Sequence, residues 1–161
     1  MYFYISLVCA GGLRDAVRRL VRCRQRERRN GHLYRRSFFF YNEAKGYAEK
    51  GALSVKRVLL VCTGNTCRSP MAEALFRSLA AAEQVDVEVK SAGVATLDGM
   101  PMSEHAAQVL REKGIDPGDF RSSQLTGDMV AWADLILTMT VQHKRRVLEM
   151  HPEAVDKTFV L

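Results

Sequence analysis

A thiol and a guanidinium flank one short loop in this sequence. Cys62 follows an apolar run, Val58 to Val61, and Arg68 comes after five intervening residues. A thiol attacks only as the thiolate, and a free cysteine is mostly protonated at pH 7. A helix N-terminus and an arginine side chain both stabilise an anion. The spacing therefore predicts that Cys62 is a nucleophile and that Arg68 binds the anion it attacks.

The loop between these side chains has the composition of an anion-binding nest. Gly64 and Asn65 tolerate a positive φ, so the backbone N–H groups of the loop can converge. A nest, a helix N-terminus and a bidentate guanidinium together fit a tetrahedral oxyanion. We expect Cys62 to accept a phosphoryl group as phosphocysteine, which water then releases without a metal or cofactor. The candidate phosphate-binding residues are Thr63, Gly64, Asn65, Thr66, Cys67 and Ser69.

Two other interpretations of this motif were weighed. A structural cysteine beside a surface arginine is disfavoured because the motif lies after a buried strand and before a helix. A zinc site formed by Cys62 and Cys67 lacks further ligands, since no cysteine follows position 67 and the histidines are scattered. We expect the histidines of residues 55–161, His105, His143 and His151, to lie on the surface.

The elements around the motif are those of an alternating α/β chain. The run from Val58 to Val61 predicts a strand covered on both faces, and Ser69-Pro70 opens an amphipathic helix. Further along, the pattern predicts a strand at 85–93, a helix that stops at Gly114, a short helix at 126–133, a strand at 135–137, a helix at 140–150 and a strand at 158–161. This order predicts a doubly wound, four-stranded parallel sheet with helices on both faces. The site is expected at the carboxyl ends of its strands.

The net positive charge of the chain comes from its first third. Residues 1–54 carry ten Arg and two Lys against four acidic residues, whereas residues 55–161 carry twelve basic and fourteen acidic residues. The net charge of +6 therefore does not indicate nucleic-acid binding by the domain, residues 55–161. We interpret residues 1–54 as a basic leader, either disordered or the product of a misassigned start codon. A basic helix that binds lipid or nucleic acid is a further alternative.

The four cysteines, Cys9, Cys23, Cys62 and Cys67, do not form the framework of a secreted disulfide-rich domain. The apolar stretch from Tyr2 to Leu13 has about half the length of a membrane span. We therefore expect a cytoplasmic protein with reduced thiols and no membrane partner. The sequence leaves the oligomeric state open.

The stretch VCTGNTCRSPMAEALF, residues 61–76, resembles the phosphate loop and first helix of the low-molecular-weight protein phosphatases. The resemblance continues through Ser91-Ala92-Gly93, Asp119 to Leu125 and ADLILTM at 133–139, and covers about residues 56–161. It implies that Cys62 is the nucleophile, that Arg68 clamps the phosphate and that Ser69 stabilises the thiolate. It also implies that Asn65 and Ser91 form a hydrogen-bonded pair that supports the loop.

Thr66 bears on the choice of substrate. Members of this family that act on phosphotyrosine commonly carry a bulky aliphatic residue before the second cysteine of the loop. The bacterial protein-arginine phosphatase branch carries threonine there, and the stretch from Met139 to Lys144 is also similar to that branch. The alternative is that Thr66 is a neutral replacement. The resemblance thus implies a phosphorylated protein substrate, with phosphoarginine preferred to phosphotyrosine.

The general acid of the family is an Asp in an Asp-Pro loop near the C-terminus, followed by a last helix. The sequence up to Leu161 holds only Asp116-Pro117, which lies before residues 119–125 and is interpreted as a turn. Asp98, near the rim of the site, is a weak substitute, and a surface turn is the preferred interpretation of this residue. We therefore expect a C-terminally truncated domain that lacks the last helix and has no general acid in this chain.

Three further functions remain as alternatives to a phosphoarginine phosphatase. They are a phosphotyrosine phosphatase, an inactive anion-binding fragment and an arsenate reductase. Arsenate reduction requires resolving cysteines downstream of the loop, and none follows Cys67 in the 161 residues. It is therefore disfavoured.

Overall fold

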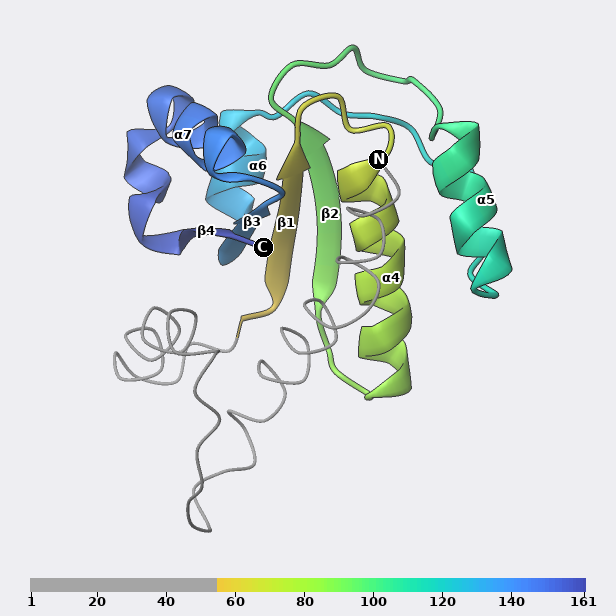
Figure 1. Ribbon diagram of the computed structural model, residues 1–161. Helices are drawn as coiled ribbons and strands as arrows, with labels where there is room; N and C mark the ends of the chain where they lie inside the picture. The colour runs from red at the N-terminus through yellow and green to blue at the C-terminus, as the bar shows by residue number, and fades with distance from the viewer. Residues whose placement is uncertain (1–54) are drawn as a thin grey trace, which may run out of the picture.

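The computed structural model describes residues 55–161, in which four parallel strands form one sheet (Figure 1). The strands are β1 (Arg57–Cys62), β2 (Glu88–Gly93), β3 (Leu135–Thr138) and β4 (Thr158–Val160). The helices are α4 (Arg68–Ala82), α5 (Glu104–Glu112), α6 (Gly127–Trp132) and α7 (Val141–Met150), with a 3-10 helix, η2 (Pro152–Lys157), before β4. The predicted α/β fold is confirmed. The basic leader, with Cys9 and Cys23, lies outside the described residues.

The β1 strand is an inner strand of the sheet. It pairs with β2 on one side, where Cys62 stands opposite Gly93, and with β3 on the other. Residues 58–61 are all fully buried, because helices cover both faces of this strand. A continuous apolar run is the expected sequence for a strand in that environment.

Helix α4 covers the first face of the sheet. Ala72, Phe76 and Ala80 recur every four residues on one side of the helix and pack against Val58 and Leu60. Burial of a side chain such as Phe76, which is 1% exposed, contributes about 1.5–3 kcal/mol to folding. Helix α5 packs in turn against the N-terminal part of α4, in a cluster formed by Met71, Ala106 and Leu110.

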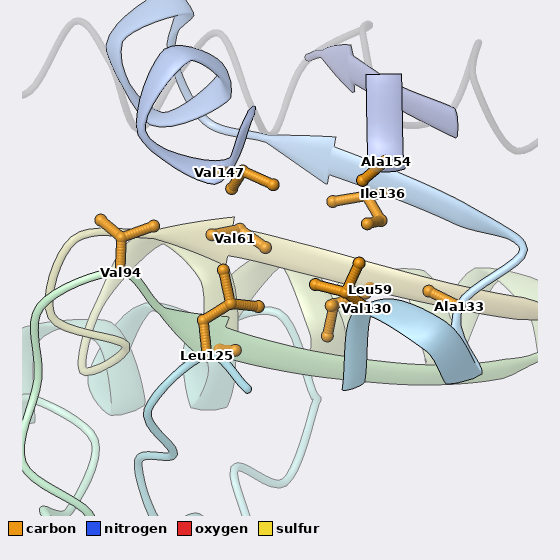
Figure 2. Close-up of a cluster of buried hydrophobic side chains, with 10 residues drawn as sticks. Leu59, Val61, Val94, Leu125, Val130, Ala133, Ile136, Val147 and Ala154 are labelled. Carbon is orange, nitrogen blue, oxygen red and sulfur yellow. The ribbon is translucent and has the colours of Figure 1, made fainter. Parts of the chain in front are cut away.

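Helices α6 and α7 cover the opposite face. Leu59 and Val61 of β1 and Ile136 of β3 point toward Val130 of α6 and Val147 of α7 (Figure 2). Both helices begin with a threonine cap. Thr126 Oγ1 accepts from Met129 N at 3.3 Å, and Thr140 Oγ1 accepts from His143 N at 3.3 Å. Each helix begins one residue after its predicted start at 126 or 140, because the threonine there is the cap.

The second strand differs from its prediction at its start. The alternation of Val85 and Val87 predicted a strand from residue 85, but β2 begins at Glu88. The chain reverses after α4 through Gln84, whose φ is +54°. Val85 and Val87 still pack against the α4 face of the core, which explains their apolar character.

The order of the strands, β2-β1-β3-β4, places a topological switch between β1 and β3. The chain leaves β1 into α4 on one face and leaves β3 into α7 on the other (Figure 1). The connecting loops diverge at the carboxyl edge of the sheet, which is where ligands bind in such folds. Cys62 lies at this edge.

Among residues 55–161, no helix combines the length and the apolar character that a bilayer span requires.

Candidate active site

The loop that carries the site runs from Cys62, the last residue of β1, to Arg68, the first residue of α4. Cys62 is 2% exposed, so its thiol lies at the base of the loop. No side chain caps the N-terminus of α4. The first N–H groups of this 15-residue helix therefore remain available to an anion.

Two polar groups approach the Cys62 sulfur. Ser69 Oγ lies 3.0 Å from Sγ, and the backbone N–H of Asn65 donates to Sγ at 3.3 Å. Both contacts favour an anionic sulfur, since each can place a hydrogen against it. Ser69 and Asn65 are themselves fully buried, so water does not compete for these bonds.

Asn65 sets the direction of the hydrogen bonds beneath the loop. Its φ is +47°, the left-handed conformation that Asn tolerates. The backbone N–H of Ser123 donates to Asn65 Oδ1 at 2.8 Å, which fixes the orientation of the amide. Asn65 Nδ2 must then donate to Ser69 Oγ and Ser91 Oγ, both at 2.9 Å. The protons of the two serine hydroxyls are left free to point away from Asn65.

The two serine hydroxyl protons point to different acceptors. The Ser69 proton can point at Cys62 Sγ, and the Ser91 hydroxyl donates to Glu73 Oε2 at 2.6 Å. Glu73 also pairs with Arg77 at 2.7 Å. Burial raises the pKa of the Glu73 carboxyl, against the opposing effects of Ser91 and Arg77. Glu73 was not predicted from the sequence, because this residue lies within a helix between alanines and belongs to no motif.

Arg68 stands at the open side of the loop. It has no carboxylate partner within the part of the chain that the structure describes, and its one hydrogen bond there goes from Nη2 to Thr63 Oγ1 at 3.4 Å. Its positive charge is therefore not neutralised by an acidic side chain of residues 55–161. This is the arrangement expected of a residue that binds an external anion.

His143 was predicted to lie on the surface, and this prediction is wrong. The residue is 6% exposed, in the first turn of α7. Its Nε2 lies 2.8 Å from Thr63 Oγ1, and its Nδ1 lies 2.9 Å from Thr140 Oγ1. Burial and the nearby Arg68 lower the pKa of His143. The imidazole was unexpected because the contact joins segments 80 residues apart.

The backbone around the loop is held from two sides. Thr96 Oγ1 donates to the Gly64 carbonyl at 2.7 Å, and Ser103 N donates to the Thr66 carbonyl at 2.7 Å. Gly93 passes so near the loop that a Cβ there would lie 2.6 Å from the Thr63 carbonyl oxygen. The segment after β2 thus packs directly on the loop that follows β1.

Asp98 and Asp116 each accept a hydrogen bond from a backbone N–H group. Asp98 Oδ1 accepts from Gln124 N at 2.6 Å, and Asp116 Oδ1 accepts from Gly118 N at 2.9 Å. The interpretation of Asp116-Pro117 as a turn is therefore correct, and the structure gives neither carboxylate a contact with Cys62 or Arg68.

A buried thiol, an uncapped helix N-terminus and a guanidinium without a carboxylate partner among residues 55–161 surround one loop, an arrangement whose charge suits a tetrahedral oxyanion. Residues 57–161 match the family described as Low molecular weight phosphotyrosine protein phosphatase. The chain belongs to this family. The family that the sequence resembled is thereby confirmed.

Similar proteins are named either protein-arginine-phosphatase or protein-tyrosine-phosphatase. The protein-arginine-phosphatase of Geobacillus stearothermophilus is 52% identical over 105 residues, which cover 65% of this chain and 68% of the relative. The probable low molecular weight protein-tyrosine-phosphatase EpsP of Ralstonia solanacearum is 43% identical over 107 residues, 66% of this chain and 71% of the relative.

A solved structure with an arginine phosphatase name is also similar to this chain. The YwlE arginine phosphatase from Geobacillus stearothermophilus matches with a TM-score of 0.60 and 52% identity, over 65% of this chain and 66% of that one. The chain thus spans about two thirds of the length of these relatives.

Proposed function

We propose that the chain is a cysteine-dependent phosphoprotein phosphatase that acts on phosphoarginine through a phosphocysteine intermediate. The observation that carries this proposal is the surroundings of Cys62. Its sulfur lies 3.0 Å from the Ser69 hydroxyl and accepts a hydrogen bond from Asn65 N at 3.3 Å. Arg68 stands beside the same loop without a carboxylate partner among the described residues.

Substrate binding uses the groups that have no anionic partner in the described part of the chain. The guanidinium of Arg68 binds two phosphate oxygens, and the loop N–H groups together with the N-terminus of α4 bind the others. The phosphorus then lies above Cys62 Sγ. Thr63, Gly64, Thr66 and Cys67 supply the backbone of this cradle.

Catalysis proceeds in two displacements at phosphorus. The Cys62 thiolate attacks, an S–P bond forms, and the bond from phosphorus to the leaving nitrogen breaks with its electron pair on nitrogen, which takes a proton. Water then attacks phosphorus, the S–P bond breaks, and inorganic phosphate and the thiolate are released. Ser69 stabilises the thiolate in both steps through the proton that Asn65 leaves free. No general acid is assigned within residues 55–161, and the sequence requires no metal or cofactor for these steps.

Relatives support this covalent route. One similar structure, 44% identical with a TM-score of 0.63, is a cysteine-to-serine mutant of the YwlE arginine phosphatase with a phosphorylated active-site serine. Cys62 at the end of β1 would accept the phosphoryl group in the same way.

The preference for phosphoarginine rests on Thr66 and on the similar proteins named protein-arginine-phosphatase. Within residues 55–161 the Thr66 hydroxyl makes no hydrogen bond, so it is available to a substrate or to a water. A leaving guanidine carries several N–H groups, whereas a tyrosine phenolate is apolar apart from its oxygen. A polar side chain at this position suits the guanidine better. We further propose that the substrate is a phosphorylated protein of the cytoplasm.

A phosphotyrosine phosphatase is the second candidate, favoured by the relatives that are named protein-tyrosine-phosphatases. The two candidates share the phosphocysteine chemistry and differ in the leaving group alone. They are separated by comparing hydrolysis of a phosphoarginine peptide and a phosphotyrosine peptide of matched sequence.

The test of the shared chemistry is phosphate release from p-nitrophenyl phosphate by the 161-residue chain. We expect release that disappears in Cys62→Ser, while Cys67→Ser retains it. Release that survives in Cys62→Ser would contradict the assignment of the nucleophile. Phosphate binding without release would indicate an anion-binding protein, and reduction of arsenate by added thiol would indicate a reductase.

A further inference from the structure

The imidazole of His143 links α7 to the phosphate loop. It is buried between two hydroxyls, Thr140 Oγ1 at 2.9 Å from Nδ1 and Thr63 Oγ1 at 2.8 Å from Nε2. Thr63 itself is exposed at the mouth of the loop and also contacts Arg68. The side chains of α7 and of the loop thus meet at one oxygen, Thr63 Oγ1.

The donors and acceptors in this chain of contacts depend on which ring nitrogen of His143 carries the proton. Thr140 Oγ1 accepts from the backbone N–H of His143, and among residues 55–161 the ring nitrogen Nδ1 is the acceptor that the structure places near the Thr140 hydroxyl proton. If Thr140 donates to Nδ1, a neutral ring carries its proton on Nε2 and donates it to Thr63 Oγ1. Burial and Arg68 lower the pKa of His143, so the ring stays neutral at pH 7.

Thr63 Oγ1 then accepts two hydrogen bonds. One comes from His143 Nε2, and the other comes from Arg68, which can only donate. A hydroxyl oxygen has two lone pairs, so both are occupied and the Thr63 proton is directed elsewhere. Because Thr63 is exposed at the mouth, this proton is available to a bound oxyanion.

We propose that His143 is a positioning residue that holds Thr63 as an acceptor, so that Arg68 rests at the mouth of the loop and the Thr63 proton faces the bound phosphate. The proposal rests on the proposed function, because it assigns His143 to the phosphate site of that function. The proposal goes beyond the proposed function because it gives α7 a part in anion binding, although α7 supplies no residue to the loop itself.

The contact between Arg68 and Thr63 has the strength that this role needs. At 3.4 Å it is longer than the 2.7–3.2 Å of a typical N–H···O bond. Thr63 therefore limits where the guanidinium rests without competing strongly with a phosphate for it. Restricting a long side chain before the ligand arrives reduces the entropy lost on binding.

A purely structural role for the imidazole makes different predictions. The cap of α7 is formed by Thr140 Oγ1 and the backbone N–H of His143, so it does not require the ring. A structural role would change stability but not phosphate affinity, and it would not depend on Thr63.

The first test measures phosphate binding as protection of Cys62 from alkylation by iodoacetate, with inorganic phosphate as the probe. In the 161-residue chain, His143→Phe should raise the phosphate concentration for half-protection about three- to tenfold, the loss expected for one hydrogen bond to the site. His143→Gln keeps an N–H near the place of Nε2 and should restore most of the affinity. In a Thr63→Val background, His143→Phe should have less than about a twofold further effect, because its partner is already gone.

Two results separate the proposal from the proposed function. No protection by phosphate in the unaltered chain would overturn the phosphate site itself. Equal protection in the unaltered chain and in His143→Phe, or an equal loss with and without Thr63, would overturn the role of His143 alone.

The second test needs no variant. Long-range proton–nitrogen correlation NMR of the unaltered chain at pH 7 reports which ring nitrogen of His143 carries the proton. A neutral ring protonated on Nε2 is expected. A proton on Nδ1, or a ring protonated on both nitrogens, would overturn the proposal even if His143→Phe failed to fold.

Discussion

Glu73 accepts a hydrogen bond of 2.6 Å from Ser91 across the interface between α4 and β2. The bond ends a chain of contacts that starts at Cys62 and passes through Ser69 and Asn65. Because Asn65 donates to both serines, Ser91 needs an acceptor for its own proton, and the carboxylate supplies it. A buried carboxyl thus ends the hydrogen-bond network beneath the loop.

The first prediction concerns the neutral analogue of this acid. Arg77 and Ser91 both donate to Glu73, and a glutamine has one acceptor and one donor in place of two acceptors. In Glu73→Gln one of the two partners faces an N–H group, and the network beneath Asn65 loses its direction. We expect alkylation of Cys62 by iodoacetate at pH 6 to slow about three- to tenfold.

A control identifies the route of this effect. If Glu73 acts through Ser91, Glu73→Gln should slow alkylation far less in a Ser91→Ala background than in the unaltered chain. Equal slowing in both backgrounds would mean that Glu73 reaches the loop by another route.

A second prediction follows from the ionisation of Glu73. Burial raises its pKa above the ordinary value of 4.5, so the folded state holds this proton more tightly than the unfolded state does. Its contribution to stability is fully present below pH 4.5 and is lost as the pH rises through the folded-state value. Urea unfolding of the unaltered chain and of Glu73→Gln should therefore show a difference that moves in favour of the unaltered chain as the pH falls from 7 toward 4.5. A difference that moves the other way would contradict this sign.

A third prediction concerns the close approach of Gly93 to the loop. In Gly93→Ala the new Cβ would lie 2.6 Å from the Thr63 carbonyl oxygen. The backbones of both residues are held by hydrogen bonds. One segment must shift, which we expect to cost about 1–3 kcal/mol of unfolding free energy and to weaken phosphate protection of Cys62. Gly127→Ala is the matched control, because its nearest contact is 3.5 Å away and it lies in α6. If both variants unfold alike, the steric argument fails.

Much of the fold and the loop could be predicted from local patterns. The apolar run of β1 and the spacing of Ala72, Phe76 and Ala80 reflect burial, which depends on the period of each element. The position of Cys62 and Arg68 on either side of a short loop is likewise a local property. These features lie close together in the sequence, so one stretch contains them.

The polar residues that support the loop from a distance could not be predicted in this way. Ser123 reaches Asn65 from 58 residues away, and His143 reaches Thr63 from 80 residues away. Periodicity shows which face of an element is buried, but it does not show which polar group meets which across two elements. Glu73 was missed for the same reason, since its partner Ser91 is on another element.

A fourth prediction concerns oxidation. Cys62 and Cys67 are both free thiols at the two ends of one tight loop, and Cys67 is partly exposed. Peroxide should oxidise Cys62 to the sulfenic acid, which the Cys67 thiol then attacks to form a disulfide with release of water. Mass spectrometry should show a reversible Cys62–Cys67 disulfide, and overoxidation of Cys62 should appear in Cys67→Ser. Sulfinic or sulfonic acid at Cys62 with Cys67 free in the unaltered chain would contradict this.

The last prediction concerns the choice of leaving group at Thr66. In Thr66→Ile the hydroxyl is replaced by an apolar branch of larger volume, while the backbone contact from Ser103 N to the residue 66 carbonyl is kept. A guanidine loses a polar neighbour, and a phenyl ring gains an apolar one. We expect the ratio of kcat/KM for a phosphoarginine peptide over a matched phosphotyrosine peptide to fall about ten- to a hundredfold, since sites that hydrogen-bond a substrate reject its analogue more strongly than apolar sites do. Thr66→Ser keeps the hydroxyl and should keep most of the ratio. Inorganic phosphate should protect Cys62 equally in all three proteins, because only the side chain of residue 66 changes and the backbone cradle that holds the phosphoryl group is kept. A ratio that stays constant while phosphate protection weakens would mean that Thr66 supports the loop and does not choose the substrate.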